Sequence, residues 1–426
     1  MTEAIVTVES LGAGGDGIAR LDGRRLFLPY TLPGERWRVR LGAKIHGGRR
    51  AIPLERVEGP ARASPVCPHF GHCGGCGLQH LPEESYRRFE LERIREPLAR
   101  RGLDPIRTDP PSTSPLHSRR RLRLAWQRRG RRLALGFRAA RSHAVVPVSV
   151  CPIARPELVA LLAPLQELLA RLEAAGTRGE LLLTSLDAGI DLLLDWREMP
   201  DLPAREGLAA FAEARDLARL SLRPAGSGGP EPLVVRRRPV LRYGPFGIPF
   251  PPGAFLQATA EGEAALRAFV ADATSPGMRV ADLYAGLGAL SLPLAERLSR
   301  LALFEASEPA VAAVSAALRS RPGSAVAIER RDLAKRPLTV EELAGFDLVI
   351  LDPPRAGARA QAEMLATAPL ARLVYISCNP ASFARDAAIL AAGGWHLARL
   401  CPVDQFLFAA DVEIGALFLR DGGDRT

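Results

Sequence analysis

Short apolar runs recur along the last third of the chain, and each ends in a polar or glycine-containing turn that precedes a helical pattern. The clearest run is Leu373–Ile376, which is followed by Ser377-Cys378-Asn379-Pro380 and then by residues typical of the first turns of a helix. Similar runs are Arg279–Tyr284, Leu301–Glu305 and Phe346–Leu351. Strand, turn and helix repeated in this way predict an open, mostly parallel sheet, as in a Rossmann-like α/β domain.

The first 58 residues have a different pattern, in which short β-like runs alternate with glycine turns and no helical period occurs. Examples are Ala4–Val8, Arg25–Pro29 and Arg36–Leu41. This pattern predicts a small β-barrel of the oligonucleotide-binding (OB) type. The residues expected to give it a basic side are Arg36, Arg38, Arg40, Lys44, Arg49 and Arg50; the alternative is an ordinary solvated face.

The middle of the chain mixes both patterns and predicts an α+β domain. Its densest positive charge is the run 119–141, which contains no acidic residue and is predicted to form a hairpin around Arg129-Gly130. With Trp126 and Phe137 pointing outward, such a hairpin is expected to face RNA, although a solvated strand pair is the alternative. The stretch Glu157–Ala175 predicts one amphipathic helix.

Composition agrees with a multidomain, water-soluble protein. The chain has 426 residues, 47% of them hydrophobic and 24% charged, and a net charge of +10 that favours a polyanionic partner. We expect three domains, at residues 1–60, 61–235 and 236–426. No signal-peptide pattern and no uninterrupted apolar run of membrane-spanning length occurs, so we expect a cytoplasmic protein.

Three of the six cysteines follow one another closely, as Cys67, Cys73 and Cys76, with the spacing C-x5-C-x2-C. Cys151 is the nearest candidate for a fourth ligand. In a cytoplasmic protein such a cluster indicates a metal rather than disulfides, and both zinc and an iron–sulfur cluster accept four thiolates. The histidines that leave a mixed zinc site open are His69, His72 and His80.

The glycine turn Ala285–Gly288 after the first strand of the C-terminal sheet discriminates between two kinds of nucleotide site. A dinucleotide-binding loop requires a further glycine at position 291, where Ser291 stands. Asp282 before the turn instead suits the nucleoside-binding loop of a class I methyltransferase, with a helix from Ala289 onward. Glu305, at the end of the second strand, is placed to accept hydrogen bonds from ribose hydroxyls.

The carboxyl ends of parallel strands open on one cleft, so we expect Gly286, Glu305, Asp352 and Cys378 to converge. Arg355 follows Asp352-Pro353-Pro354 where amino-methyltransferases have an aromatic residue, and a thiol follows the next strand. Both features favour methylation at carbon. The position of Cys378 before a helix favours its thiolate, whereas the alternative is a small buried cysteine that fills space.

A thiolate solves a chemical problem, because carbon 5 of uracil is a poor nucleophile. Addition of the thiolate to carbon 6 produces an enolate that attacks a sulfonium methyl group. A base must then remove the carbon 5 proton so that the thiol can leave. Glu413 is the residue that the chain offers as this base.

With these motifs the chain resembles the RNA uracil-5-methyltransferase family. It is most similar to the branch that has an N-terminal TRAM domain and a [4Fe–4S] cluster and acts on 23S rRNA. The resemblance rests above all on Asp352–Arg355 and Ser377–Pro380 together, and it covers nearly the whole chain. It implies S-adenosylmethionine as cofactor and RNA as partner; we expect a monomer that binds neither DNA nor membrane.

The resemblance also assigns roles to individual residues. It makes Cys67, Cys73, Cys76 and Cys151 the cluster ligands, Cys378 the nucleophile and Glu413 the base. The implied cofactor positions are Gln257, Tyr284, Glu305, Asp332 and Asp352, and the implied contacts to the target base are Phe255 and Asp352.

The sequence departs from the family pattern at Ala285, Ala289 and the run Phe406–Glu413, where the family has Cys, Asn and Phe-Pro-x-Thr-x-His-x-Glu. Asp411 in this run is an alternative base. Three alternatives to the 23S rRNA enzyme are a tRNA uracil-5-methyltransferase, a non-catalytic RNA-binding or assembly factor that kept the fold, and a redox protein that uses the cluster.

Overall fold

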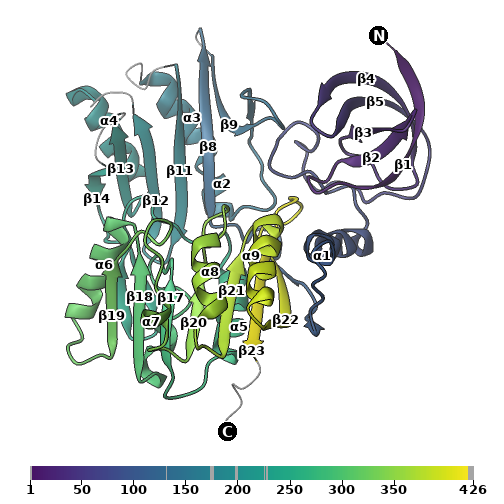
Figure 1. Ribbon diagram of the computed structural model, residues 1–426. Helices are drawn as coiled ribbons and strands as arrows, with labels where there is room; N and C mark the ends of the chain where they lie inside the picture. Colours follow the sequence, from purple (N-terminus) through teal and green to yellow (C-terminus); the bar gives the residue numbers. More distant parts are fainter. Residues whose placement is uncertain are drawn as a thin grey trace.

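The computed structural model describes residues 2–130, 132–172, 177–196, 200–224, 226 and 229–420. Arg131 of the predicted hairpin and residues 173–175 of the predicted helix lie outside these ranges. The chain forms an N-terminal barrel and two larger sheets, which lie one above the other in Figure 1, with the barrel to one side above helix α1 (Glu83–Ala99). Within the described ranges no helix is long and apolar enough to cross a membrane.

The barrel strands are β1 (Glu3–Leu11), β2 (Gly17–Leu21), β3 (Arg24–Leu28), β4 (Arg36–Ile45) and β5 (Gly48–Glu58). They close in the order β1-β2-β3-β5-β4 around a small apolar core, which confirms the predicted barrel. Its expected basic side is partly neutralised, because Arg36 pairs with Glu58 at 2.7 Å and Arg38 with Glu55 at 3.2 Å.

The central sheet has the strand order β10-β9-β8-β11-β12-β13-β14, and three helices pack against it. Its strands are β8 (Arg121–Arg129), β9 (Arg132–Arg138), β10 (Val145–Pro147), β11 (Arg178–Leu186), β12 (Gly189–Trp196), β13 (Arg219–Pro224) and β14 (Glu231–Val235). Its helices are α2 (Pro156–Val159), α3 (Leu162–Arg171) and α4 (Leu202–Ala214).

Two sequence-based predictions for the central sheet need correction. The hairpin at Gly130 is present, but Trp126 is only 1% exposed and packs in the core instead of facing outward. The helix predicted over 157–175 is broken into α2 and α3, because Pro164 lacks the N–H that would bond to the Ala160 carbonyl and its ring clashes with that carbonyl.

The C-terminal sheet has the order β19-β18-β17-β20-β21-β23-β22-β6. Its strands are β17 (Arg279–Leu283), β18 (Arg300–Glu305), β19 (Val326–Arg330), β20 (Leu348–Leu351), β21 (Arg372–Ser377), β22 (Trp395–Asp404) and β23 (Glu413–Arg420). Its helices are α5 (Ala260–Asp272), α6 (Glu308–Arg319), α7 (Val340–Leu343), α8 (Arg359–Thr367) and α9 (Pro380–Ala392), and a separate hairpin, β15 (Val240–Tyr243) with β16 (Phe246–Pro249), precedes it. The first five strands run parallel and β23 is antiparallel to β21, with an apolar layer on each face. This arrangement confirms the predicted Rossmann-like sheet.

The helix predicted from Ala289 onward is replaced by a turn and the 3₁₀ helix η2 (Leu292–Arg297). The physical reason is Pro293, which lacks the N–H that an α-helix would need to bond to the Ala289 carbonyl.

The segment between α1 and the central sheet contributes two short strands to the C-terminal sheet. Strands β6 (Arg107–Thr108) and β7 (Ser112–Thr113) pair with β22, so this segment extends the C-terminal sheet.

Candidate active site

The carboxyl ends of β17, β18, β20 and β21 lie at one edge of the C-terminal sheet, because these strands run parallel in register. Tyr284, Asp352 and Cys378 are the residues immediately after β17, β20 and β21, and Glu305 is the last residue of β18. The topology therefore brings together four residues that are spread over 95 positions of the sequence.

The glycine turn after β17 is fixed by Glu305. One carboxylate oxygen accepts a hydrogen bond from the Gly286 N–H at 2.9 Å, and the other accepts from the Ser307 N–H at 2.7 Å. Tyr284 adopts a left-handed backbone conformation with φ of 61°, which non-glycine residues rarely adopt. Burial raises the pKa of Tyr284 to about 12, and the nearby Asp332 charge adds to this effect.

Asp282, the residue before Leu283 in β17, is buried beneath the surface of the site. Its carboxyl group is buried and accepts a hydrogen bond from the Ser291 hydroxyl at 2.5 Å, while burial raises the pKa of Asp282 to about 7. Ser291, which stands where a dinucleotide-binding loop has glycine, is thus used to hold Asp282. Asp332 lies half-exposed after β19, where its carboxylate accepts from the Ala334 N–H at 3.2 Å.

Asp352 and the turn that follows it contact the segment of the thiol. Burial raises the pKa of Asp352 to about 7. The Arg355 carbonyl accepts hydrogen bonds from the Asn379 side-chain amide at 2.8 Å and from the Ser382 hydroxyl at 3.0 Å. These bonds lock the Asp-Pro-Pro-Arg turn against the start of α9, next to Cys378.

Cys378 and Glu413 meet across the β21–β23 ladder. The last registered pair is Ser377 with Ile414, and Cys378 and Glu413 are the next residues on the two strands. Burial, followed by the Glu413 charge, raises the pKa of Cys378 to about 11, while Arg355 lowers it. The expected preference for the thiolate at the helix end is therefore outweighed by burial.

Glu413 is 4% exposed, and its Oε2 has no hydrogen-bond partner within the described part of the chain. Burial and then the charge of Asp352 raise its pKa well above the usual range, whereas a hydrogen bond from Gln405 lowers it. Asp411, the alternative base, has a different environment, since it is partly exposed and bonded to Arg355 at 2.9 Å.

Gln405 connects Glu413 with Gln257, one of the residues expected to bind the cofactor. Its amide donates to the Gln257 side-chain oxygen at 2.6 Å, and its own oxygen accepts from the Ala258 N–H at 2.8 Å. Sequence reasoning missed Gln405, because its only signal is a buried polar residue between a strand and an aromatic run.

Phe255 is 66% exposed and carries the Arg121 guanidinium 5.7 Å from its ring centroid. Arg121 also donates to the Leu256 carbonyl at 3.0 Å, and Arg120 donates to the Gln257 carbonyl at 3.0 Å. The first arginines of the basic run therefore hold the loop of Phe255 in place and do not form a free surface.

All four predicted ligand cysteines line one cavity of about 320 Å³. Burial raises the pKa of Cys76 to about 12 and also raises those of Cys73 and Cys151. Among the described residues, no group of three or more His, Cys, Asp or Glu side chains adopts an arrangement that holds a metal ion.

The histidines near this cavity have separate environments. His69 also lines it, whereas His72 is exposed. His80 lies 3.4 Å from the Thr31 carbonyl of the barrel, and burial lowers its pKa to about 4. His72 and His80 therefore lie outside the cavity lining, which leaves the four thiols as its main donor set.

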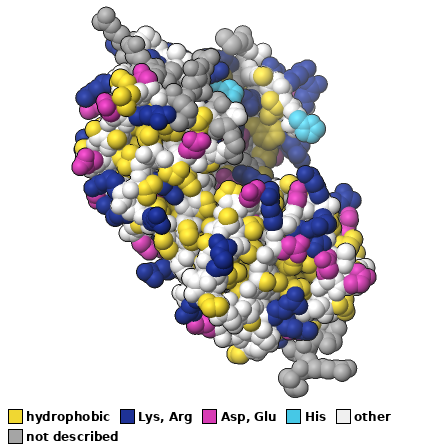
Figure 2. All heavy atoms as spheres, turned by 90° about the vertical axis from the view of Figure 1, so that its left-hand side faces the viewer, with side chains coloured by type: hydrophobic (Ala, Val, Ile, Leu, Met, Phe, Trp, Pro, Cys, Tyr) yellow, Lys and Arg dark blue, Asp and Glu magenta, His cyan; other side chains and the backbone are white. Residues whose placement is uncertain are grey.

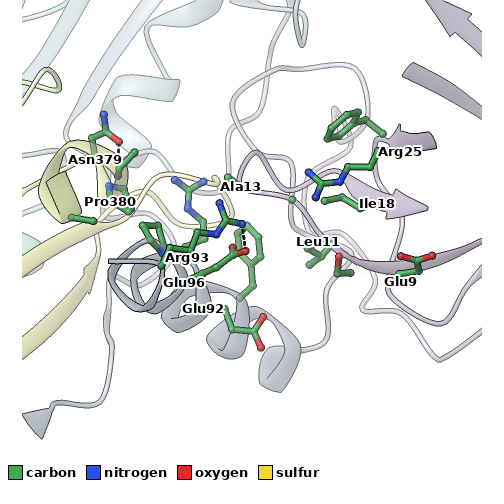
Figure 3. Close-up of a pocket in the computed structure, with 18 of the residues that line it drawn as sticks. Glu9, Leu11, Ala13, Ile18, Arg25, Glu92, Arg93, Glu96, Asn379 and Pro380 are labelled. Atoms are coloured by element: carbon green, nitrogen blue, oxygen red, sulfur yellow. Dashed lines mark hydrogen bonds and ion pairs between the residues drawn. The ribbon is translucent and has the colours of Figure 1, made fainter. Parts of the chain in front are cut away.

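A second hollow, of about 940 Å³, separates the barrel from α1 and ends at Asn379 and Pro380, beside Cys378. Figure 3 shows Arg25 on the barrel side facing Arg93 and Glu96 on α1. The opposite face of the molecule, in Figure 2, mixes basic, acidic and apolar side chains without one dominant charge. We name this hollow the barrel groove.

Comparison with known proteins agrees with this geometry. Residues 249–421 match the family described as tRNA (Uracil-5-)-methyltransferase, and residues 2–42 match the TRAM domain. An uncharacterized RNA methyltransferase of Brucella suis is 38% identical over 417 residues, covering 97% of both chains. The 23S rRNA (uracil(1939)-C(5))-methyltransferase RlmD of Edwardsiella ictaluri is 35% identical, covering 97% of this chain and 95% of its own.

Among solved structures, the tRNA (uracil-54, C5)-methyltransferase of Pyrococcus abyssi in complex with S-adenosyl-L-homocysteine is similar in fold. It has a TM-score of 0.76 and 21% sequence identity, and the match covers 97% of this chain and 99% of that one. The fold and the site define a class I methyltransferase. The chain belongs to the RNA uracil-5-methyltransferase family, as the full-length relatives establish.

Proposed function

We propose that this enzyme methylates carbon 5 of a uridine in 23S rRNA, using S-adenosylmethionine, as a cytoplasmic monomer. The observation that carries the proposal is the pairing of Cys378 and Glu413 at the end of the β21–β23 ladder, with Asp352 beside them. The 23S rRNA target is favoured by the full-length relative from Edwardsiella ictaluri. The net charge of +10 and the TRAM domain suit an RNA substrate.

In this mechanism the Cys378 thiolate adds to carbon 6 of uracil and forms a C–S bond. The resulting electron density at carbon 5 attacks a methyl group, which S-adenosylmethionine supplies as an activated sulfonium methyl. Glu413 then takes the proton from carbon 5, and the electron pair left behind expels the sulfur, so that the C–S bond breaks. The buried position of Glu413 suits this role, because a raised pKa makes its carboxylate a stronger base.

Binding of the cofactor is assigned to the edge of the sheet. Glu305 and Tyr284 flank the glycine turn, Asp332 follows β19, and Gln257 and Asp352 complete the set. An acidic residue after the second strand suits the ribose hydroxyls, which donate hydrogen bonds to it. Phe255, with its exposed ring, is assigned to stack on the target base together with Asp352.

The four cysteines are assigned to a [4Fe–4S] cluster. Their convergence on one cavity supports a thiolate set, which suits iron–sulfur as well as zinc, and His69 is the histidine that also lines this cavity. The cluster has no electron to supply in this reaction, so we assign it a structural role. The barrel groove, which ends beside Cys378, is assigned to the RNA strand on either side of the target nucleotide.

Two substitutions test the catalytic roles. Cys378→Ala should abolish both methylation and any covalent RNA adduct, because no C–S bond can form. Glu413→Gln should still form the bond and transfer the methyl group, and then accumulate a denaturant-resistant protein–RNA band, because the carbon 5 proton has no acceptor. Cys401→Ala is the control, since Cys401 lies in β22 outside the site and should leave turnover unchanged.

The outcomes separate the alternatives. Normal turnover of Glu413→Gln together with a stalled adduct of Asp411→Asn would move the base by two residues. Mapping of 5-methyluridine in 23S rRNA and tRNA, with and without this gene, decides the target. If neither RNA loses 5-methyluridine when the gene is removed, the non-catalytic RNA-binding or assembly role would be favoured.

A further inference from the structure

The turn between β22 and β23 carries Gln405 and leads to Glu413, and an unusual backbone conformation marks it. Phe408 has a φ of 63°, a left-handed conformation that costs free energy for a non-glycine residue. Such a conformation persists only where surrounding contacts hold it. Those contacts therefore show what determines the shape of the turn.

One side of the turn is held by the segment after the cysteines. The Phe408 carbonyl accepts hydrogen bonds from the Gly77 N–H at 2.9 Å and from the Leu78 N–H at 3.0 Å. The other side is held by helix α1. The Tyr86 hydroxyl accepts a hydrogen bond from the Phe408 N–H at 2.8 Å, and its ring lies 5.8 Å from that of Phe408.

Tyr86 is itself oriented by a buried carboxylate. Its hydroxyl donates to Asp404 Oδ2 at 2.7 Å, while Oδ1 of the same residue accepts from the Phe406 N–H at 3.0 Å. Asp404 is fully buried and Tyr86 is 6% exposed. The Tyr86 hydroxyl thus forms hydrogen bonds both with Asp404, the last residue before the turn, and with Phe408, the strained residue within it.

Gln405 lies between these anchors. It donates a hydrogen bond to the Glu413 carboxylate and another to Gln257, so its position depends on the turn that carries it. We propose that Tyr86 is a positioning residue for the proton-abstraction step, which holds the 405–408 turn so that Gln405 keeps Glu413 aimed at carbon 5. This inference rests on the proposed function, and it adds a residue of α1 that lies 318 positions from Asp404 in the sequence.

Glu90, one helical turn after Tyr86 on α1, lies close to the same Asp404 carboxylate. It is 3% exposed, and burial together with the Asp404 charge raises its pKa to about 9, while Arg87 lowers it. Below that pH Glu90 is neutral beside Asp404. As the pH rises through it, Glu90 gains a negative charge that repels the Asp404 carboxylate. The groups that act on this pair are Tyr86, Arg87 and the two carboxyls themselves.

The experiment compares Tyr86→Phe with Glu413→Gln and with Ile94→Val. Ile94→Val is a packing control on the same helix, since Ile94 is fully buried among apolar residues. Each variant is incubated with unmodified 23S rRNA and S-adenosylmethionine, and the denaturant-resistant adduct and its decay are followed. We expect Tyr86→Phe to release the adduct on the order of tenfold more slowly than the wild type, at an unchanged rate of adduct formation. Ile94→Val should release it normally.

Each result has one meaning. Accumulation in Tyr86→Phe and Glu413→Gln but not in Ile94→Val supports the inference. Accumulation in Glu413→Gln alone overturns the inference and leaves the proposed function standing. No accumulation in Glu413→Gln rejects the base assignment itself, and the inference with it.

A second variant keeps the test independent of the phenol. Glu90→Gln removes the titrating carboxyl and retains a side chain of the same size. Burial and the Asp404 charge raise the pKa of Glu90, so at alkaline pH, where Glu90 ionises, the wild type should release the adduct more slowly while Glu90→Gln does not. Parallel pH profiles of the two proteins would overturn the role of the Tyr86–Asp404–Glu90 group.

Discussion

Three acidic groups of the candidate site are buried or half-buried, Glu413 fully and Asp352 and Cys378 in part. Burial is the largest cause of the raised pKa of Asp352, Cys378 and Glu413, and the charges of Asp352 and Glu413 further raise that of Cys378. Grouped acids with raised pKa values are typical of functional sites, because a raised pKa makes the deprotonated form of each group a stronger base. Arg355 opposes this trend, since its charge lowers the pKa of both Cys378 and Glu413.

Removal of the Arg355 charge should make the thiol harder to ionise. Arg355→Met should raise the pKa of Cys378 above its present value of about 11, so that less thiolate is present at any pH below it. Alkylation of Cys378 by iodoacetamide at pH 8 should slow by roughly threefold, and the rise of the rate with pH should move to more alkaline pH. Peptide mass spectrometry separates Cys378 from the other cysteines.

Asp411→Asn is the matched control, because it removes the ion-pair partner of Arg355 and leaves the positive charge in place. Alkylation in this variant should not slow. Equal alkylation rates in Arg355→Met and the wild type would show that the guanidinium is too well solvated to influence the thiol.

The residues at the strand ends could be predicted from the sequence, because parallel strands share one edge and the chain order determines which side chains meet there. Asp352 and Cys378 are examples. Gln405 and Tyr86 could not be predicted, because their contacts join segments 148 and 318 residues apart and no local pattern encodes them. The pKa of Cys378 was misjudged for a related reason, since a helix end is visible in the sequence and the burial of the thiol is not.

At the scale of elements, some arginines of the basic run 119–141 hold other elements in place, and others lie exposed on the surface. Arg128 donates to the carbonyls of Leu169 and Ala170 at 2.6 and 2.9 Å, and also to that of Leu172, at the C-terminal end of α3. Carbonyls at a helix end lack intrahelical partners and carry partial negative charge, so a guanidinium there stabilises the helix. Arg129 and Arg132, at the tip of the hairpin, are exposed.

Substitutions in this hairpin should therefore affect different properties, the free energy of unfolding in one case and the salt dependence of RNA binding in the other. Arg128→Ala should lower the free energy of unfolding by about 2 kcal/mol, because it removes charged hydrogen bonds to three carbonyls. It should leave the salt dependence of RNA binding unchanged. Arg129→Gln with Arg132→Gln should instead reduce the slope of log affinity against log salt by about 1 for each RNA phosphate that the variant no longer binds. Denaturant unfolding and binding titrations at several salt concentrations measure the two quantities.

Parallel changes would contradict this division. If Arg128→Ala flattened the salt dependence without loss of stability, its guanidinium would have to leave α3 and bind phosphate.

Element type could largely be predicted from hydrophobic period, and the failures have local causes. The predicted helices at 157–175 and from Ala289 fail at Pro164 and Pro293, because each proline lacks the N–H that a continuous helix needs at that point. The predicted outward position of Trp126 is wrong because Trp126 shares one face of β8 with Leu122 and Leu124, and that face packs in the core.

At the scale of the whole molecule, the central and C-terminal parts of the chain line the cysteine cavity, and the barrel lines a neighbouring hollow that also includes Cys73 and Cys76. Phe406 and Asp411, from the turn that leads to Glu413, line it together with the cysteines, and Arg119 from the central part lies 5.9 Å from the Phe406 ring centroid. Asp16 of the barrel forms an ion pair with Arg141 of the central part nearby. A group bound in this cavity would therefore stabilise the contacts between parts rather than one part alone.

The protein purified without oxygen should accordingly be brown and hold about four iron atoms per chain, bound by the four cysteines. Cys67→Ser should lower the iron content and the thermal midpoint together, because a ligand bound only by the folded state stabilises it and its loss removes that stabilisation. RNA affinity should fall as well, since Phe406 and Asp411, from the turn that leads to Glu413, line the same cavity as the cysteines. Cys401→Ser is the control, because Cys401 lies in β22 and should leave iron content and RNA affinity as they are.

Stoichiometric zinc without iron from anaerobic expression would reject the iron–sulfur assignment and retain a structural metal. An unchanged thermal midpoint in Cys67→Ser, despite the loss of iron, would instead reject the role of the cluster in joining the three parts.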